Sequence, residues 1–342
     1  MHPGRRAGGL QVECDGLMKI AVAGYRLSRR ADTLAAQRTT GENMSFRIHA
    51  RRHAADEVRR VAKERIAEAV AALDSGTPTG VHDARKRLKE IRALLRLVHK
   101  PLGKKLFTRH NRQFRDIGQQ LSSLRDAAAM VECWDALVAE DPRRFSSAAM
   151  KRARARLQAR VADIAPDQPQ AHAELLASLG AASEAVADWP LRAQGFALFK
   201  AGVLRTCQEG RRAMKAVQQK RSDELLHEWR KRVKDHWYQT RLLRDAWPHL
   251  LKARQKSLET LAGYLGDDHD LALLQQLLDE QPALFGASNT RKSITLAVEA
   301  RRLRLFEDAL ELGARLYAEK PENLAELWSA YWKIASKAAK AG

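Results

Sequence analysis

The chain has little cysteine and no long apolar run. Its 342 residues include three cysteines, Cys14, Cys133 and Cys207, and no two are close enough in sequence to form a C-x-x-C pair. This excludes a disulfide framework and a zinc ribbon, and it predicts a reducing, cytoplasmic location. No apolar run reaches the roughly 18 residues of a membrane-spanning helix, and no compact apolar segment of a secretory signal is evident near the start. We therefore expect a protein that neither spans a membrane nor is exported.

Aromatic and acidic residues are also scarce. Phe, Trp and Tyr make up 6% of the chain, and 41 acidic residues stand against 61 Lys and Arg, which gives a net charge of +20. Such an excess predicts polyanionic partners, namely nucleic acid, an acidic membrane surface or polymeric phosphate. Residues 1–44 hold seven basic and four acidic residues, so most of the excess lies in the part that follows.

Strand patterns are almost absent, and an all-α fold is predicted. From Ser45 onward apolar residues recur at spacings of three and four, with Ala, Leu, Arg, Glu and Lys dominating. Residues 1–44 show no such persistent pattern, and we predict that they are disordered or lie upstream of a start at Met44. The predicted helices cover residues 45–73, 78–98, 104–125, 126–140, 146–162, 170–187, 192–219, 223–246, 250–265, 269–280, 287–317 and 322–339.

An internal repeat relates the two halves of the chain. VHDARKRLKEIRALLRLV (residues 81–98) aligns without gaps to LHEWRKRVKDHWYQTRLL (residues 226–243), at an offset of 145 that matches His82 to His227. Thr77 and Ser222 precede these helices as equivalent N-caps. Asp126 and Asp270 align further on, at an offset of 144. We predict two pseudo-symmetric helical-bundle repeats, about 45–188 and 191–340, within one domain over 45–340.

Each of the two repeated helices has an apolar face and a separate cationic face. In the first helix Val81, Ala84, Leu88, Ile91, Leu95 and Val98 form the apolar stripe. The first ridge is His82, Arg85, Lys86, Lys89, Arg92 and Arg96; the second ridge is His227, Arg230, Lys231, Lys234 and Arg241. A solvated face is the simpler interpretation of one such ridge. However, the nearby acids lie off both ridges, and like charges one turn apart repel, so the repetition favours an anion as the usual occupant.

The two equivalent histidines fit this interpretation. Cationic neighbours lower the pKa of an imidazole, whereas a bound phosphate chain raises that pKa again. We expect each histidine to donate a hydrogen bond to phosphate, and binding to tighten as the pH falls through the histidine range.

These residues resemble the CHAD family, the conserved histidine α-helical domain. The resemblance covers about 45–340 and rests on the H-x-x-R-K motifs at His82 and His227, with the Arg125-Asp126 and His269-Asp270 segments. It implies two four-helix bundles flanking a central basic cavity, binding of inorganic polyphosphate and association with polyphosphate granules. The implied ligand contacts are both ridges and candidates on the preceding helix, Lys200, Arg205, Arg211, Arg212 and Lys215. Arg51, Arg52, Arg59 and Arg60 are weaker candidates. Trp237 stands where Arg92 stands in the first copy, so the two halves are expected to contribute unequally.

Other functions are weighed against polyphosphate binding. The E-x-E-x-K signature of the triphosphatase domain that some relatives carry is not found, and we expect neither an enzymatic activity nor a cofactor. His49 and His53 have a spacing that can hold a metal, but no third ligand is evident, and the acidic run 266–270 is explained more simply as a helix start. Nucleic acid is the main alternative ligand. A scaffold that recruits partners to granules is a further alternative.

Overall fold

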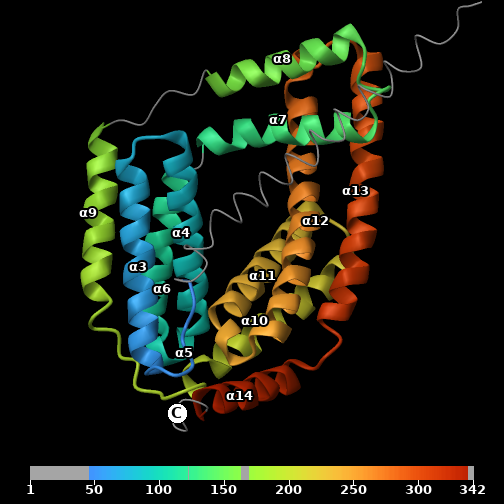
Figure 1. Ribbon diagram of the computed structural model, residues 1–342. Helices are drawn as coiled ribbons and strands as arrows, with labels where there is room; N and C mark the ends of the chain where they lie inside the picture. Colours follow the sequence, from blue (N-terminus) through green and yellow to red (C-terminus); the bar gives the residue numbers. More distant parts are fainter. Residues whose placement is uncertain (1–45, 122, 163–168, 338–342) are drawn as a thin grey trace, which may run out of the picture.

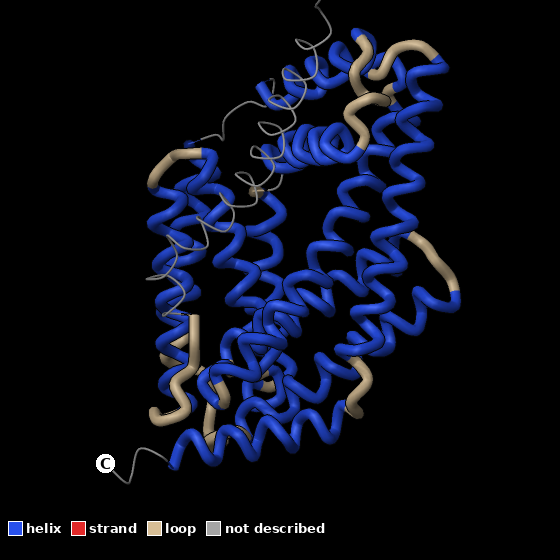
Figure 2. The backbone as a smooth tube through the Cα atoms, turned by 45° about the vertical axis from the view of Figure 1, so that its right-hand side comes forward, coloured by secondary structure: helices blue, strands red, loops and turns tan. Residues whose placement is uncertain are grey.

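The computed structural model describes residues 46–121, 123–162 and 169–337, and its helices are shown in Figure 1. No strand occurs among these described residues (Figure 2), so the predicted all-α class is confirmed. None of the described helices is both long and apolar enough to cross a membrane. The N-terminal residues 1–44 lie outside the described part of the chain.

The described residues form twelve α-helices and two short 3-10 helices, most of them close to the predicted ranges. The first half contains α3 (Ala54–Asp74), α4 (Pro78–Leu97), α5 (His99–Leu102), α6 (Lys104–Gln120), α7 (Ser123–Glu140), α8 (Ala148–Ala162) and α9 (Pro169–Ala185). The second half contains α10 (Ala197–Gln219), α11 (Asp223–Leu242), η1 (Arg244–Ala246), α12 (Pro248–Glu280), η2 (Pro282–Leu284), α13 (Ser288–Leu316) and α14 (Pro321–Lys337).

Several predicted boundaries are wrong. The break predicted after residue 125 falls inside α7, and the helix predicted from residue 192 begins at Ala197. The first helix begins at Ala54, not at residue 45, because the preceding segment runs across the second half, where Ile48 N donates a hydrogen bond to Leu242 O at 2.9 Å. The predicted break between residues 265 and 269 does not exist, since α12 is continuous over 33 residues. Asp268 is buried within this helix and accepts a hydrogen bond from Arg302 of α13 at 3.0 Å. The acidic run is therefore not a helix start.

One hydrophobic core joins most of the two halves. Helices α3, α4, α6 and α9 lie side by side, α10 to α13 form a second group, and α14 crosses the end where the groups meet (Figure 1). Buried residues of these helices and of the segment before α3, from Phe46 to Trp332, form one large cluster, while the far parts of α12 and α13 belong to a second cluster. At Gly202 of α10 an added Cβ would lie 2.0 Å from the carbonyl oxygen of Leu97. The absence of a side chain there lets the two groups approach backbone to backbone.

Helices α7 and α8 pack mainly on the second half of the chain. They contact α12, α13 and η2, and the buried residues at these contacts form a second hydrophobic cluster. Trp134 of α7 is its centre, with ring centroids 5.3 Å from Phe145 and 6.2 Å from Phe285. The far ends of α12 and α13 are thus covered by helices from the other half of the sequence.

Candidate functional site

The first ridge lies on α4, beside the stripe that this helix buries. Leu88 is buried, whereas His82 and Lys89 are exposed. Thr77 is the N-cap, because its hydroxyl accepts a hydrogen bond from Gly80 N at 3.0 Å. The predicted cap and the predicted separation of the two faces are confirmed. The other members of the first ridge are half-buried: Arg85, Lys86, Arg92 and Arg96.

Two arginines of the first ridge are held by α6 and its C-cap residue. Arg85 donates a hydrogen bond to Leu121 O at 2.7 Å, and Arg92 Nε donates one to Asn111 Oδ1 at 3.2 Å. Burial, and then repulsion from Arg96, lowers the pKa of Arg92 to about 10, so it remains charged at neutral pH. Guanidinium groups fixed in this way lose little further freedom when an anion binds.

The second ridge lies on α11 in the corresponding way. Ser222 caps the helix by accepting a hydrogen bond from Leu225 N at 3.3 Å, as predicted. Trp229 is completely buried on the core face, while Lys231 is exposed. The other members are His227, Arg230 and Lys234, which are half-buried, and Arg241, which is buried.

His227 is surrounded by cationic and imidazole groups. Its ring centroid lies 4.5 Å from that of His269 on α12. Arg230 lies against the same helix at Gly266, where an added Cβ would be 3.4 Å from its Nη2. Burial, followed by the charges of His269, Lys231 and Arg230, lowers the pKa of His227 to about 4. In the protein without an anion this imidazole is therefore neutral at physiological pH.

Trp237 fills the position of Arg92 in the second ridge. Lys234 Nζ lies 5.2 Å from the centroid of a Trp237 ring, and Arg241 Cζ lies 5.0 Å from it. Both distances are within the range of a cation–π interaction. The aromatic ring thus positions the neighbouring cations of the second ridge where the first ridge has another arginine.

Helices α4 and α11 are joined by two reciprocal ion pairs. Arg96 Nη1 lies 2.9 Å from Asp235 Oδ1, and Arg241 Nη1 lies 3.1 Å from Glu90 Oε1. The two arginines are equivalent at the offset of 145, and so are the two acids. Figure 1 shows the helices converging toward their carboxyl ends and diverging toward their amino ends. The two ion pairs fix the place where α4 and α11 cross, so the two ridges diverge from a common point.

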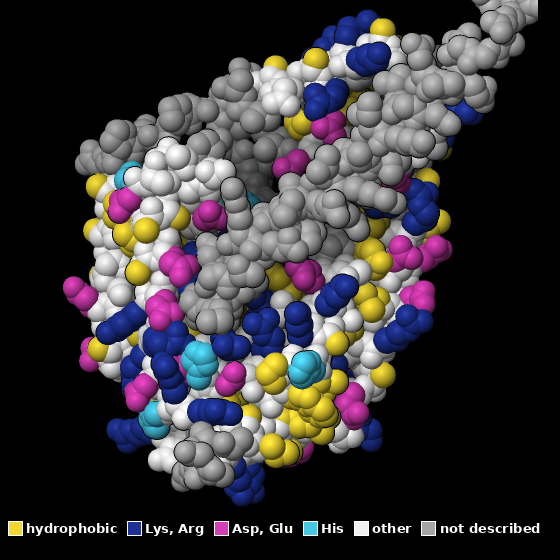
Figure 3. Space-filling view, in the orientation of Figure 1, with side chains coloured by type: hydrophobic (Ala, Val, Ile, Leu, Met, Phe, Trp, Pro, Cys, Tyr) yellow, Lys and Arg dark blue, Asp and Glu magenta, His cyan; other side chains and the backbone are white. Residues whose placement is uncertain are grey.

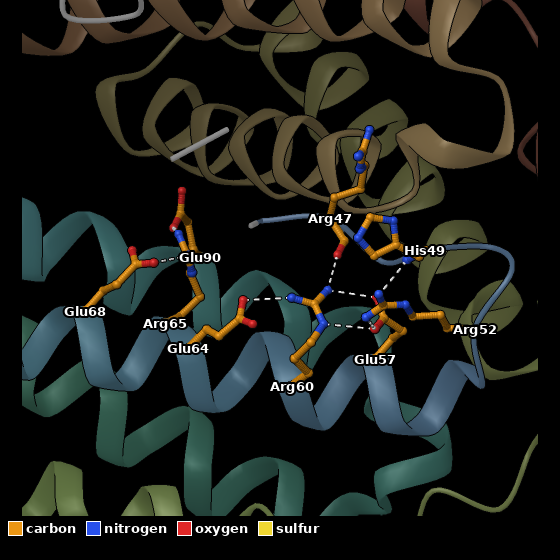
Figure 4. A network of polar contacts seen from close by, with 9 residues as sticks. All are labelled: Arg47, His49, Arg52, Glu57, Arg60, Glu64, Arg65, Glu68 and Glu90. Atoms are coloured by element: carbon orange, nitrogen blue, oxygen red, sulfur yellow. Dashed lines mark hydrogen bonds and ion pairs between the residues drawn. The ribbon is translucent and has the colours of Figure 1, made fainter. Parts of the chain in front are cut away.

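Glu90 is the centre of a buried charge network that the sequence did not reveal. Its side chain is fully buried, and its Oε2 lies 3.1 Å from Arg87 Nη1 and 3.5 Å from Arg65 Nη1. Arg65 also pairs with Glu68 on α3 (Figure 4). The sequence does contain one signal for this role. An acid lies off the ridge at the equivalent position of both copies, Glu90 and Asp235, and this repetition could have predicted a contact between the two helices.

Three of the four weaker candidates on α3 and before it, Arg52, Arg59 and Arg60, pair with acids nearby. Arg60 donates hydrogen bonds to Glu57 at 2.9 Å and to Glu64 at 2.7 Å (Figure 4). Arg52 Nη1 also reaches Glu57 at 3.5 Å, and His49 N donates to the same carboxylate. This face of α3 is balanced by its own acids, and in the second ridge Lys231 likewise pairs with Glu228.

The candidates on α10 lie on the surface. Lys200 pairs with Glu326 of α14, and Arg205 pairs with Glu209 one turn further along α10. The remaining candidates are half-buried or exposed: Arg211, Arg212 and Lys215.

No group of three or more metal-ligating side chains gathers anywhere in the part of the chain that the structure describes. His53 contacts Asp56 at 3.0 Å on the surface of α3. The side chains of Arg125 and Asp126, which belong to the motif that the resemblance rests on, lie outside the described residues.

A family comparison agrees with the motif at these helices. Residues 60–279, more than half of the 342, match the family model of the CHAD domain. The match begins in α3, ends in α12 and includes both ridges. No curated protein matches the chain significantly.

Proposed function

Because the chain belongs to the CHAD domain family, we propose that it binds inorganic polyphosphate along the two ridges. The observation that carries the proposal is the reciprocal pairing of α4 and α11, which brings two helices of the same charge pattern to one crossing. A flexible phosphate chain lies between their amino-terminal halves, in a central basic cavity. It contacts both ridges at once, which gives multivalent affinity.

The two halves act as pseudo-symmetric repeats in this proposal. Besides the reciprocal pairs, a second contact supports the repeat. Arg87 Nε lies 2.7 Å from Glu68 on α3, and its equivalent Arg232 lies 2.7 Å from Glu209 on α10. Each ridge helix is therefore attached to the helix before it through the same arginine.

The ridge residues divide into two roles. His82, Arg85, Lys86 and Lys89, with His227, Arg230, Lys231 and Lys234, contact phosphate oxygens, together with Arg92. Arginine supplies planar bidentate contacts and lysine compact charge. Arg96 and Arg241 are positioning residues, because their guanidinium groups face Asp235 and Glu90. The cations of α10 form an outer part of the surface. Binding occurs without hydrolysis or a cofactor, and it attaches the protein to polyphosphate granules in the cytoplasm.

Charge reversal on the ridges tests the proposal. Replacing Arg85, Lys89, Arg230 and Lys234 with Glu is expected to lower the affinity for long-chain polyphosphate at least 100-fold at fixed salt, since four phosphate contacts become repulsive. The matched control reverses four exposed cations outside the ridges and thus changes the net charge equally: Arg143, Lys151, Arg152 and Lys292. Equal losses in both variants would show that only net charge matters and would refute ridge binding.

Competition between ligands tests the alternative. Labelled long-chain polyphosphate is displaced by unlabelled polyphosphate, duplex DNA, structured RNA or short phosphates at constant ionic strength. Long-chain polyphosphate is expected to compete best, because a thin chain enters between two helices more easily than a duplex. Stronger competition by a nucleic acid would overturn the assignment in favour of nucleic-acid binding.

A further inference from the structure

A hollow lies at the other end of α11 from His227. It has a volume of about 720 Å³ and forms where η1, the start of α12 and α14 meet the segment before α3. Its walls include Trp247, Tyr331 and Ile334, and its rim includes Arg51 and Arg52. Hydrophobic side chains gather on the lower part of the face in Figure 3, with Lys, Arg and His side chains beside them.

The apolar wall is unusually exposed. Trp247 is 44% and Ile334 is 68% exposed, although Trp247 packs edge-to-face on Tyr331 with centroids 4.6 Å apart. Leu250 lies one turn after Trp247, and Leu327 lies one turn before Tyr331, and both are also exposed. On α14 these positions form an i, i+4, i+7 stripe. Exposed apolar patches of this kind mark interaction sites.

The charge of the rim indicates the chemistry of the occupant. Arg51 is exposed, and the Arg52 side chain is 64% exposed, with its Nη1 at 3.5 Å from Glu57 Oε1. Asp245, the acid in the lining, already accepts a hydrogen bond from Ala50 N at 2.9 Å and lies 3.8 Å from Arg47. The amino end of α12 adds a favourable field for negative groups. A hollow also accepts a protruding side chain, which a flat bilayer does not supply, and a second copy would bring a like-charged rim.

We propose that this hollow docks a partner protein through a short amphipathic helix that carries aliphatic or aromatic anchors flanked by Asp or Glu. The anchors fill the space beside Trp247, Tyr331 and Ile334, and the flanking carboxylates pair with Arg51 and Arg52. About 15 residues of α11 separate His227 from this end of the helix, or roughly 22 Å at 1.5 Å per residue. Both surfaces can thus be occupied together, and the docking surface goes beyond polyphosphate binding.

Selection from a displayed library of random 16-residue peptides tests the docking surface. The full chain serves as the target, and the Ile334→Asp variant serves for counter-selection. Enriched peptides are expected to carry Leu, Ile, Phe or Trp at helical spacing together with Asp or Glu. No enrichment over the variant, or enrichment of acidic peptides without such anchors, would overturn the proposal.

Matched variants locate the contact. The affinity of an enriched peptide is expected to fall at least tenfold with Ile334→Asp and with Arg52→Glu. It is expected to stay unchanged with Leu303→Asp, because Leu303 is a similarly exposed leucine, 49%, on α13. The polyphosphate affinity of Ile334→Asp is expected to be near that of the parent chain. The peptide assay therefore tests the docking surface, and the polyphosphate assay tests ridge binding, independently of each other.

Two results would assign another occupant and refute the partner helix. One is a dimer of the parent chain in light scattering that Ile334→Asp dissociates. The other is binding to vesicles of phosphatidylglycerol that the same substitution abolishes while leaving the vesicle binding of Leu303→Asp intact.

Discussion

Protonation of His227 should couple polyphosphate binding to pH. In the free protein its pKa is lowered to about 4, first by burial and then by His269, Lys231 and Arg230, whereas Glu228 opposes this shift. A phosphate chain beside the ring favours the imidazolium form and raises this pKa. Because the bound state then holds the proton more tightly than the free state, binding takes up a proton and tightens as the pH falls.

The size of the effect follows from the two pKa values. If the bound chain restores the pKa of His227 to its ordinary value of about 6.5, the affinity at pH 5.5 is about tenfold that at pH 7.5. The gain begins as the pH falls through the bound-state pKa, and it levels off near the free-state value of about 4. The ring of His269 lies 4.5 Å from that of His227, and its charge is one of the causes that lower the pKa of His227.

Titration calorimetry with long-chain polyphosphate at constant ionic strength measures this coupling. Repeating each titration in buffers of different ionisation enthalpy gives the number of protons taken up. His227→Gln keeps a hydrogen-bond donor but cannot titrate, so the pH dependence should flatten and proton uptake should fall. His172→Gln on α9 is the control and should behave like the parent chain. Unchanged pH dependence in His227→Gln would refute the role of this histidine.

Three further predictions concern stability. Glu90→Gln should lower the free energy of unfolding in urea by about 3–5 kcal/mol, because buried arginines lose their counter-charge. The control, Glu311→Gln at an exposed ion pair, should change the free energy of unfolding by less than ~1 kcal/mol. Equal effects of the two substitutions would contradict the buried network. Gly202→Ala should lower the free energy of unfolding by roughly 1–3 kcal/mol or more, because the added methyl group forces α10 away from the Leu97 backbone. Gly180→Ala, which has open space around it, should leave stability unchanged or raise it. A larger loss with Gly180→Ala than with Gly202→Ala would refute the close contact at Gly202. Burial holds the pKa of His236 well below the ordinary 6.5, so the folded protein loses stability as the pH falls below about 6.5, where only the unfolded chain gains the proton. His236→Leu should reduce this loss of unfolding free energy in urea titrations from pH 7 to 5. An unchanged dependence of the unfolding free energy on pH would refute the role of His236.

The class of the fold and the two faces of the ridge helices could be predicted because both depend on local periodicity. Leu88 and Trp229 are buried where the apolar stripe placed them, and Thr77 and Ser222 cap their helices. The break near Gly266 was predicted because the acidic run 266–270 was interpreted as a helix start. It is absent because tertiary contacts, including the pairing of Asp268 with Arg302, satisfy the acids inside the helix.

Contacts between distant segments could not be predicted in the same way. Sequence periodicity gives the face on which Arg96 lies, but not that Asp235 lies opposite it. The packing of Trp134 from the first half against Phe285 from the second depends likewise on how the helices cross. Such contacts decide which cations of a charged helix are paired with acids and which face outward.

The distribution of acids explains how one basic helix can serve both a core and an anion site. Glu90 and Asp235 lie near the carboxyl halves of α4 and α11, and there they pair with Arg241 and Arg96 across the crossing. These two acids are thus used where the helices meet, and the crossing tolerates a high density of arginine. Glu228, nearer the amino end of α11, pairs instead with Lys231 and Arg232 of its own helix. Toward the amino ends the helices diverge, and the exposed His82 lies in that part of the first ridge. Replacing an interface acid should therefore lower stability first, and it should lower polyphosphate affinity only by changing the angle at which the two ridges meet.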